Sequence, residues 1–403
     1  MCAGRIFNAV YCAFFAMIII LPLLFFNLTG KVSSENRMLT EFPALPENFA
    51  GIGPFTRGVE SWLDDRIGFR KQFITSYRLL ELKVFGVSPS KLVALGKDGT
   101  AFLLEAQQSK IRYEELYESA GESGNGSPLD TQQLAGMTYA AELFNRAKTP
   151  VIMLAVPTSP LFNYDKLPQY LRLIIKKKTP ENHPVALAVA QFEALHPRDA
   201  HYFLYPFKET LKLAKCYSPY PQKNFHWSWS PFTVMISEMI AERFKQPVRR
   251  QFSPTDFSPC TTRSDLAHLV GINDFMNEND LCPSAEFYVG ENIVDSALAE
   301  AFPESRGAHV SAGTYYKNTA VASGKILVIG DSFNFNLGIP LARNFREVLV
   351  LDYYGVMRET HNNSEPVLRQ IKNAYNPEQI VIVRHNIFMD LQAARELCIF
   401  FEN

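Results

Sequence analysis

The fold is decided by the stretch KILVIGDSF, residues 325–333. Its first part is almost entirely apolar and ends at Gly330, which predicts a buried strand. Such a strand places Asp331 and Ser332 at the carboxyl edge of a sheet, where ligands of open α/β sheets bind. Ser332 is therefore a candidate nucleophile, and a nucleophilic serine needs a base to remove its proton.

The sequence around this stretch alternates between apolar strands and helical patterns. Further strands are expected at residues 150–157, 347–351 and 379–383, and helices at residues 337–344 and 364–375. The strands are apolar at nearly every position, which is typical of a parallel sheet with both faces buried. The sequence therefore predicts an α/β fold with a parallel sheet flanked by helices.

The composition excludes some classes of function. The chain has 403 residues with 40 basic and 41 acidic side chains, so it lacks the basic excess of a nucleic-acid-binding protein. Its six cysteines show neither a CxxC motif nor the Cys/His spacing of a zinc site. We therefore expect no nucleic acid, no metal and no cofactor.

Two cysteines in the second half of the chain form a natural pair. If the main domain lies in an oxidising compartment, Cys260 and Cys282 are expected to form a disulfide. Cys216 and Cys398 are either buried free thiols or a second bridge, and the spacing does not choose between these alternatives.

An apolar segment near the N-terminus predicts the location of the protein. Residues 9–26 are interrupted only by Tyr11 and Pro22. As a helix they cover about 27 Å, close to the thickness of the hydrocarbon core of a membrane. Because no Ala-x-Ala cleavage site follows, we favour an uncleaved signal-anchor over a removed signal peptide. One N-terminal anchor predicts a single-pass inner-membrane protein with its main domain in the periplasm.

Three segments are expected along the chain. Residues 1–30 form the anchor, and residues 31–90 form a helical juxtamembrane segment, because apolar residues recur at helical spacing from Val59 to Phe85. Residues 91–403 form the main domain. It includes an excursion at about residues 247–307 that is rich in Pro, Ser, Asp and Asn and has little periodicity. Long excursions of this kind are usually functional or partly disordered.

A candidate base precedes Ser332 by about a hundred residues. The motif Asn-Phe-His-Trp at residues 224–227 is the one place where a histidine has aromatic neighbours and a polar side chain two residues earlier. A histidine that accepts the serine proton needs an acceptor on its other ring nitrogen, which fixes the tautomer. Taken alone, His226 fits a core histidine beside two tryptophans at least as well.

Several short motifs follow one another in a recognisable order. They are Glu35-Asn36-Arg37 running into Phe42-Pro43, Asp65-Arg66-Ile67-Gly68-Phe69-Arg70, Gly96-Lys97-Asp98-Gly99, Val156-Pro157 with Tyr164 and Leu167-Pro168, Asn224-Phe225-His226-Trp227, and Gly330-Asp331-Ser332. In this order the chain resembles the alginate O-acetyltransferase proteins of the SGNH-hydrolase-like family, the AlgJ and AlgX type. The resemblance covers about residues 1–390, but it offers no counterpart for the excursion.

The resemblance implies both a fold and a function. The fold is an SGNH-hydrolase-like sheet that follows a transmembrane anchor and a helical juxtamembrane segment. The function is O-acetyl transfer to an exported or cell-surface polysaccharide, with Ser332 as nucleophile, His226 as base and an acetyl-serine intermediate. A membrane-bound acyltransferase is the expected acetyl donor.

Two positions depart from the family pattern. Asn224 stands where the family has the triad Asp, and Ser159 stands where its members commonly carry Lys. An amide has no charge to stabilise the imidazolium, and in the serine-protease template the Asp→Asn change costs about 10⁴ in rate. Asp331 and Asp352 are the candidates nearest in sequence to replace the lost carboxylate. Besides a transferase, a catalytically impaired polysaccharide-binding or scaffold subunit and a carbohydrate esterase therefore stay open.

Substrate contacts are expected at the same edge of the sheet. Tyr353 and Tyr354 follow a predicted strand and could stack on a sugar ring, although a half-buried strand end fits them equally well. Asp331, next to the nucleophile, is the third candidate for substrate binding.

Overall fold

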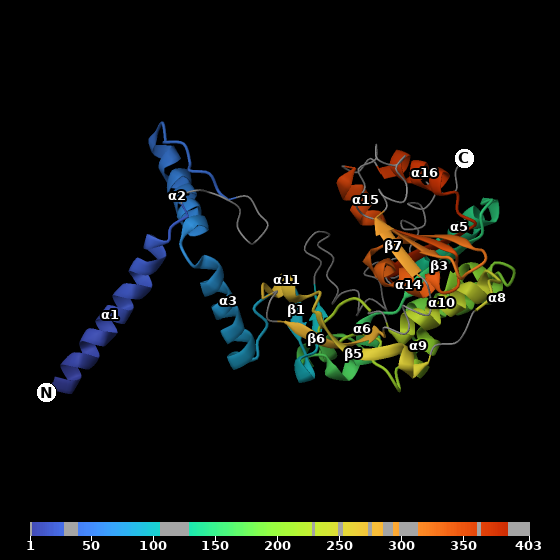
Figure 1. Cartoon of the computed structure of the whole chain (residues 1–403), viewed down its shortest axis with the longest axis horizontal. Helices are drawn as coiled ribbons and strands as arrows, with labels where there is room; N and C mark the ends of the chain where they lie inside the picture. Colours follow the sequence, from blue (N-terminus) through green and yellow to red (C-terminus); the bar gives the residue numbers. More distant parts are fainter. Residues whose placement is uncertain are drawn as a thin grey trace. The chain divides into compact units, whose positions relative to one another are not determined.

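The structure is a computed structural model, and it describes residues 2–27, 39–104, 129–227, 230–248, 253–272, 276–284, 293–297, 313–360 and 364–385. The chain divides into two compact units, Met1–Pro89 and Ser90–Asn403 (Figure 1). Both candidate catalytic residues, His226 and Ser332, lie in the second unit.

The first unit is helical. It contains α1 (Cys2–Leu24), η1 (Phe49–Gly51), α2 (Ile52–Arg66), α3 (Arg70–Leu80) and the π-helical turn η2 (Glu81–Phe85). The ring of Trp62 in α2 lies 5.3 Å from that of Phe26 and 5.2 Å from that of Phe42. The Arg66 guanidinium lies over the Trp62 ring at 4.9 Å and donates a 2.7 Å hydrogen bond to the Thr40 carbonyl. These contacts attach the segments before and after residues 28–38 to α2.

The expected anchor over residues 9–26 overlaps most of α1. Among the helices that the structure describes, however, none combines the length and the apolar character needed to cross a membrane.

The second unit is built on a seven-stranded sheet, and the parallel α/β fold is confirmed. In spatial order its strands are β4 (Phe203–Leu204), β3 (Val151–Val156), β11 (Gln379–His385), β9 (Lys325–Gly330), β10 (Glu347–Asp352), β8 (Gly313–Asn318) and β7 (Ile293–Ala297). The first five run parallel, whereas β8 is antiparallel to β10 and β7 is antiparallel to β8. This antiparallel edge was not predicted. The strand that leads to Ser332, β9, lies between β11 and β10.

Helices bury both faces of the sheet. Residues 326–329 of β9 are at most 1% exposed, and successive side chains point to opposite faces. On one face, Leu327 and Ile329 share a core with α5 (Leu129–Arg146), α8 (Pro184–Leu195) and α16 (Ser364–Tyr375). On the other face, α14 (Gly338–Ala342) packs against Tyr316 of β8 and against α10 (Pro231–Arg243). Helices therefore cover both faces of the sheet on either side of β9, the strand that leads to Ser332.

The second unit also contains shorter elements, among them the 3-10 helices η3 (Lys97–Gly99), η4 (Tyr164–Lys166), η5 (Ala200–Tyr202) and η6 (Pro254–Asp256). Others are the hairpin of β1 (Val93–Leu95) and β2 (Ala101–Leu103), and the helices α6 (Ser159–Asn163), α7 (Gln169–Ile174), α9 (Phe207–Leu213) and α15 (Tyr353–Glu359). Ser159, the second departure from the family pattern, is buried at the start of α6, where its Oγ accepts a 3.2 Å hydrogen bond from Asn163.

The excursion contains an ordered hairpin, which was not predicted. β5 (Phe257–Arg263) and β6 (Asn277–Pro283) pair antiparallel over their whole length, and α11 (Ala267–Val270) lies between them in sequence. Most of the hairpin side chains are exposed or half-buried, so no apolar alternation marks these strands.

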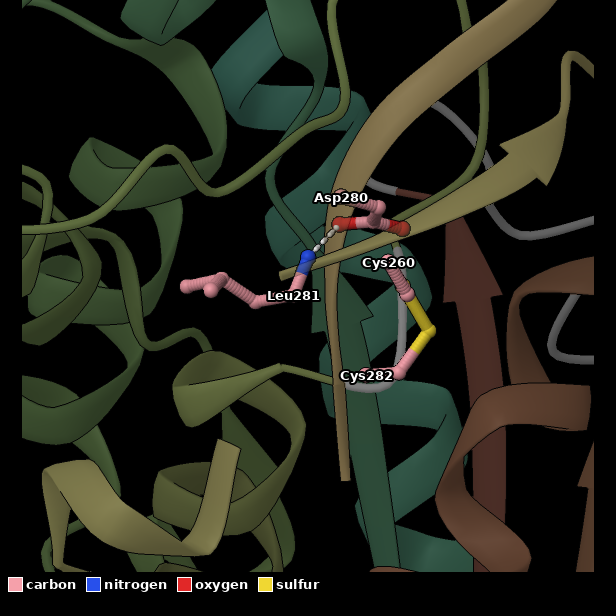
Figure 2. Close-up of a disulfide and its surroundings, with 4 residues drawn as sticks. All are labelled: Cys260, Asp280, Leu281 and Cys282. Carbon is pink, nitrogen blue, oxygen red and sulfur yellow. Dashed lines mark hydrogen bonds between the residues drawn. A yellow bond between two sulfur atoms is a disulfide. The ribbon is translucent and has the colours of Figure 1, made fainter. Parts of the chain in front are cut away.

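The predicted disulfide between Cys260 and Cys282 is confirmed. It joins β5 to β6, with the two Cα atoms 5.8 Å apart, and Figure 2 shows it beside Asp280 and Leu281. Cys216 is a free thiol but is exposed, so the expectation that it is buried is wrong. Cys398 lies outside the described residues.

Candidate active site

Ser332 lies at the carboxyl end of β9, as the sequence predicts. Gly330 ends the strand, and a Cβ at this position would overlap a carbonyl of the neighbouring strand β11, so the turn requires glycine. Asp331 caps the 3-10 helix η8 (Ser332–Leu337), because its Oδ1 accepts the Phe333 N–H at 3.1 Å. The buried strand and the capped helix together hold Ser332 at the sheet edge.

The Asp331 side chain belongs to this turn. Its second oxygen, Oδ2, accepts the backbone N–H of His385 at 2.6 Å, so both carboxylate oxygens bind backbone. The side chain is buried, and burial raises the pKa of its carboxyl group. Neither oxygen is the partner of His226 Nδ1, so the expectation that Asp331 replaces the triad carboxylate is wrong. Its role in substrate binding stays a prediction.

His226 lies within hydrogen-bonding distance of Ser332, which confirms the predicted pairing. The distance from His226 Nε2 to Ser332 Oγ is 2.7 Å. The other ring nitrogen, Nδ1, lies 2.6 Å from Oδ2 of Asp265. A carboxylate at Nδ1 favours a proton there and leaves Nε2 free to accept the serine proton. The three side chains form the Ser–His–Asp arrangement of a nucleophilic serine.

Asp265 is the carboxylate that sequence reasoning missed. It stands two residues after the end of β5, inside the excursion, and 39 residues after His226. The other candidate, Asp352 at the end of β10, lies 3.5 Å from the Arg358 guanidinium, and burial raises its carboxyl pKa. No local pattern distinguishes Asp265 from the other carboxylates of the excursion, because its role depends on where the hairpin folds back.

Asn224 occupies a supporting position and does not take the place of the triad Asp. Its Oδ1 accepts the backbone N–H of Asp265 at 2.9 Å. The Asp265 carboxylate in turn accepts the backbone N–H groups of Phe225 at 2.8 Å and of His226 at 2.9 Å. The Asn-Phe-His segment therefore both donates hydrogen bonds to Asp265 and accepts one from it.

The rings around His226 fix its orientation. The Phe333 ring lies 4.9 Å from the imidazole, and the Phe225 ring lies 5.1 Å from it. Trp227 is buried, and its indole N–H donates a 2.8 Å hydrogen bond to the Phe333 carbonyl, so it is a core residue with a satisfied donor. The side chains of His226 and Asp265 are 30% and 28% exposed, which leaves the site open to small molecules.

A cavity of about 480 Å³ opens on the site. Its lining consists of Asn224, His226, Trp227, Thr262, Arg263, Asp265, Asp280, Leu281, Cys282, Pro283, Ser332, Phe335 and Asn336. The hairpin therefore supplies one wall and the segment with Ser332 the other. Among the described residues, no group of three or more His, Cys, Asp and Glu is placed to hold a metal ion.

The two tyrosines expected to contact substrate do not line this cavity. Tyr353 is only 3% exposed, and the Arg384 guanidinium lies over its ring at 5.2 Å and over that of Tyr354 at 5.7 Å. The Tyr353 ring is buried in this structure and Tyr354 is 37% exposed, and the contact of either ring with a sugar stays a prediction. The exposed aromatic ring in the cavity lining is Phe335, which is 46% exposed.

The fold and the site define a class: α/β proteins with a Ser–His–Asp arrangement at the carboxyl edge of a parallel sheet. No family model matches the sequence, and no curated protein matches it. Among solved structures the chain is similar to the O-acetyltransferase domain of AlgJ from Pseudomonas putida, with 10% identity over 76% of this chain and 98% of that one and a TM-score of 0.41. It is also similar to AlgX from Pseudomonas aeruginosa, with 12% identity, 76% and 67% coverage and a TM-score of 0.36.

A third similar structure is a DHHW family protein from Eubacterium siraeum, with 11% identity, 76% and 95% coverage and a TM-score of 0.45. The resemblance to AlgJ and AlgX that the motifs indicate is thus found among solved structures. At these identities the similarity concerns the fold alone.

Proposed function

We propose that this protein is an O-acetyltransferase that acts on an exported or cell-surface polysaccharide through an acetyl group on Ser332. The observation that carries the proposal is the hydrogen-bonded chain from Ser332 Oγ through His226 to Asp265. The order of the sequence motifs, which resembles that of the AlgJ and AlgX type, favours acetyl transfer among the reactions open to such a serine.

The geometry supports two successive acyl transfers. As Ser332 Oγ attacks the acetyl carbonyl of the donor, its proton passes to His226 Nε2, and the Asp265 carboxylate stabilises the imidazolium. The imidazolium then protonates the leaving group. In the second half, Nε2 takes the proton of a sugar hydroxyl, whose oxygen attacks the acetyl-serine. The C–O bond to Ser332 breaks, and the imidazolium returns the proton to Ser332 Oγ. The N–H groups of Phe333 and Asn334 already bind Asp331, so the Ser332 backbone N–H is the candidate donor at the start of η8 to the developing oxyanion.

The disulfide supports a location outside the cytoplasm, because such bonds persist in oxidising compartments. We therefore propose that the second unit lies in the periplasm. The acetyl donor in this proposal is a membrane-bound acyltransferase, and the acceptor is the polysaccharide.

A carbohydrate esterase is the second candidate, and the partial exposure of His226 and Asp265 favours it, since water has access to an acetyl-serine there. A scaffold subunit without activity was suggested by Asn224. Because Asp265 supplies a carboxylate to His226, that reason no longer applies.

Trapping the acetyl-enzyme tests the proposal. The protein is mixed with an aryl acetate, and the peptide that contains Ser332 is analysed by mass spectrometry after rapid acid quenching. We expect one acetyl group on Ser332 and none in Ser332→Ala. Adding oligosaccharides should then release the acetyl group faster than buffer alone and yield an acetylated sugar. Release at the same rate with and without sugar would identify an esterase, and no acetylation of Ser332 would refute both candidates.

A further inference from the structure

The segment that carries His226 is attached to the hairpin by two carboxylates. Glu278 of β6 accepts the backbone N–H of Gln222 at 2.7 Å with one oxygen and that of Lys223 at 2.8 Å with the other. Asp265 accepts the next pair, the N–H groups of Phe225 and His226. Four of the five backbone donors from residue 222 to residue 226 therefore bind side chains of the excursion.

Asn224, the remaining residue of the segment, accepts a hydrogen bond from the excursion with its side chain. Asn224 Oδ1 accepts the N–H of Asp265 at 2.9 Å, and the neighbouring Ser264 hydroxyl donates a 2.5 Å hydrogen bond to the Lys223 carbonyl. These bonds fix the backbone on which the Asp265 carboxylate stands. The contact between Asp265 Oδ2 and His226 Nδ1 therefore depends on how closely the backbone at Asp265 is held to the backbone at residues 222–226.

The chemistry of position 224 fits such a role. A carboxylate there would lie beside that of Asp265, and two like charges close together disfavour each other. An uncharged amide accepts the same backbone N–H without this repulsion. Glu278 is only 3% exposed, and a buried carboxylate is tolerated because both its oxygens accept hydrogen bonds from backbone.

We propose that Asn224 and Glu278 are positioning residues that attach the disulfide-closed hairpin to the His226 segment and thereby hold Asp265 against His226. They touch no reacting atom, and their contribution to the rate passes through Asp265. The proposal deepens the proposed function, on which its kinetic test rests, but the placement of Asp265 can be measured without any substrate.

The test compares Asn224→Ala, Asn224→Asp, Glu278→Gln and Asp265→Asn with the unaltered protein. Circular dichroism and thermal melting first establish that each variant folds. Proton NMR then follows the low-field resonance of the His226 Nδ1–H, assigned by its loss in His226→Ala. Finally, kcat and KM for an aryl acetate are measured, together with the rate of Ser332 labelling by an arylsulfonyl fluoride.

If the proposal holds, Asn224→Ala and Glu278→Gln each lower kcat about tenfold to a hundredfold with little change in KM, and weaken or shift the low-field resonance. Asn224→Asp keeps an acceptor for the Asp265 N–H, so it loses less activity than Asn224→Ala and gains none over the unaltered protein. A folded Asn224→Ala or Glu278→Gln variant with an unchanged resonance and unchanged kcat would overturn the proposal. An unaltered protein that shows the resonance but never acetylates Ser332 would refute the proposed function alone.

Discussion

The turn that carries Ser332 and the hairpin that carries Asp265 between its two strands are held in place by different forces. The Ser332 turn follows a fully buried strand in the middle of the sheet, and the carboxylate of Asp331 binds two backbone N–H groups below it. The hairpin of β5 and β6 buries few side chains and depends on one disulfide and on hydrogen bonds to residues 222–226. The buried core therefore holds the nucleophile Ser332 in place, whereas the position of Asp265 depends on the disulfide and a small set of polar contacts.

The largest effect is expected for the nucleophile itself. Ser332→Ala removes the oxygen that forms the acetyl-enzyme, so acetyl transfer should fall by roughly 10⁴-fold or more. Loss of one half-buried hydroxyl costs little stability, and the melting temperature should stay nearly unchanged. Activity on an aryl acetate and thermal melting check both points. Substantial residual turnover in this variant would mean that another group is the nucleophile.

The next effect separates the two carboxylates of the site. Asp265→Asn should lower kcat by about 10⁴, as in the serine-protease template, and leave the protein folded. Asp331→Asn is the matched control, because Asp331, like Asp265, accepts two backbone N–H groups with its two oxygens but is not the partner of His226 Nδ1. That change should cost about 1–3 kcal/mol in the free energy of unfolding. Urea denaturation and kcat together give the comparison, and the reverse pattern would assign the triad role to Asp331.

A smaller effect is expected from opening the disulfide. Cys260 and Cys282 are 22 residues apart in sequence, and closing a loop of this size contributes about 3 kcal/mol to the free energy of unfolding in the chain-entropy model. Replacing Cys260 and Cys282 by Ser should therefore loosen the hairpin and lower kcat by less than Asp265→Asn does, since the bonds to residues 222–226 remain. Cys216→Ser, at an exposed free thiol, is the control and should have no effect. Full activity in the double variant would show that the hydrogen bonds alone place Asp265.

The last prediction concerns stability alone, and how pH acts on two histidines of the buried core. Burial lowers the pKa of His183 and of His385 to about 3, against an ordinary value of 6.5. In the unfolded chain these two histidines therefore become protonated below about pH 6.5, whereas in the native state they become protonated only near pH 3. The stability from both histidines is complete above pH 6.5 and falls progressively as the pH drops towards 3.

Melting temperatures measured from pH 7.5 down to pH 4 should therefore decrease steadily. His183→Phe and His385→Phe should flatten the decrease, whereas substitution of the exposed His201 should not. A pH-independent melting temperature in the unaltered protein would contradict the burial of these two rings.

The pairing of Ser332 with His226 followed from the order of the motifs and the resemblance it carries, because His226 alone fits a core histidine. The sequence by itself determined the parallel sheet and the position of Ser332 at its edge. Strands buried on both faces are apolar throughout, and the glycine, the aspartate cap and the serine are adjacent, so these features are recorded in local pattern. The Cys260–Cys282 bond was also predictable, because few other pairings exist for cysteines in that part of the chain.

Only the tertiary structure decided which carboxylate reaches the histidine and which aromatic ring faces the cavity. Asp265 meets His226 because a largely exposed hairpin, which has no apolar pattern, folds back onto residues 222–226. Tyr353 follows a strand at the same edge of the sheet, yet it is buried under Arg384, whereas Phe335 is exposed at the cavity. Such contacts depend on distances between residues far apart in the chain, and composition and periodicity carry no record of them.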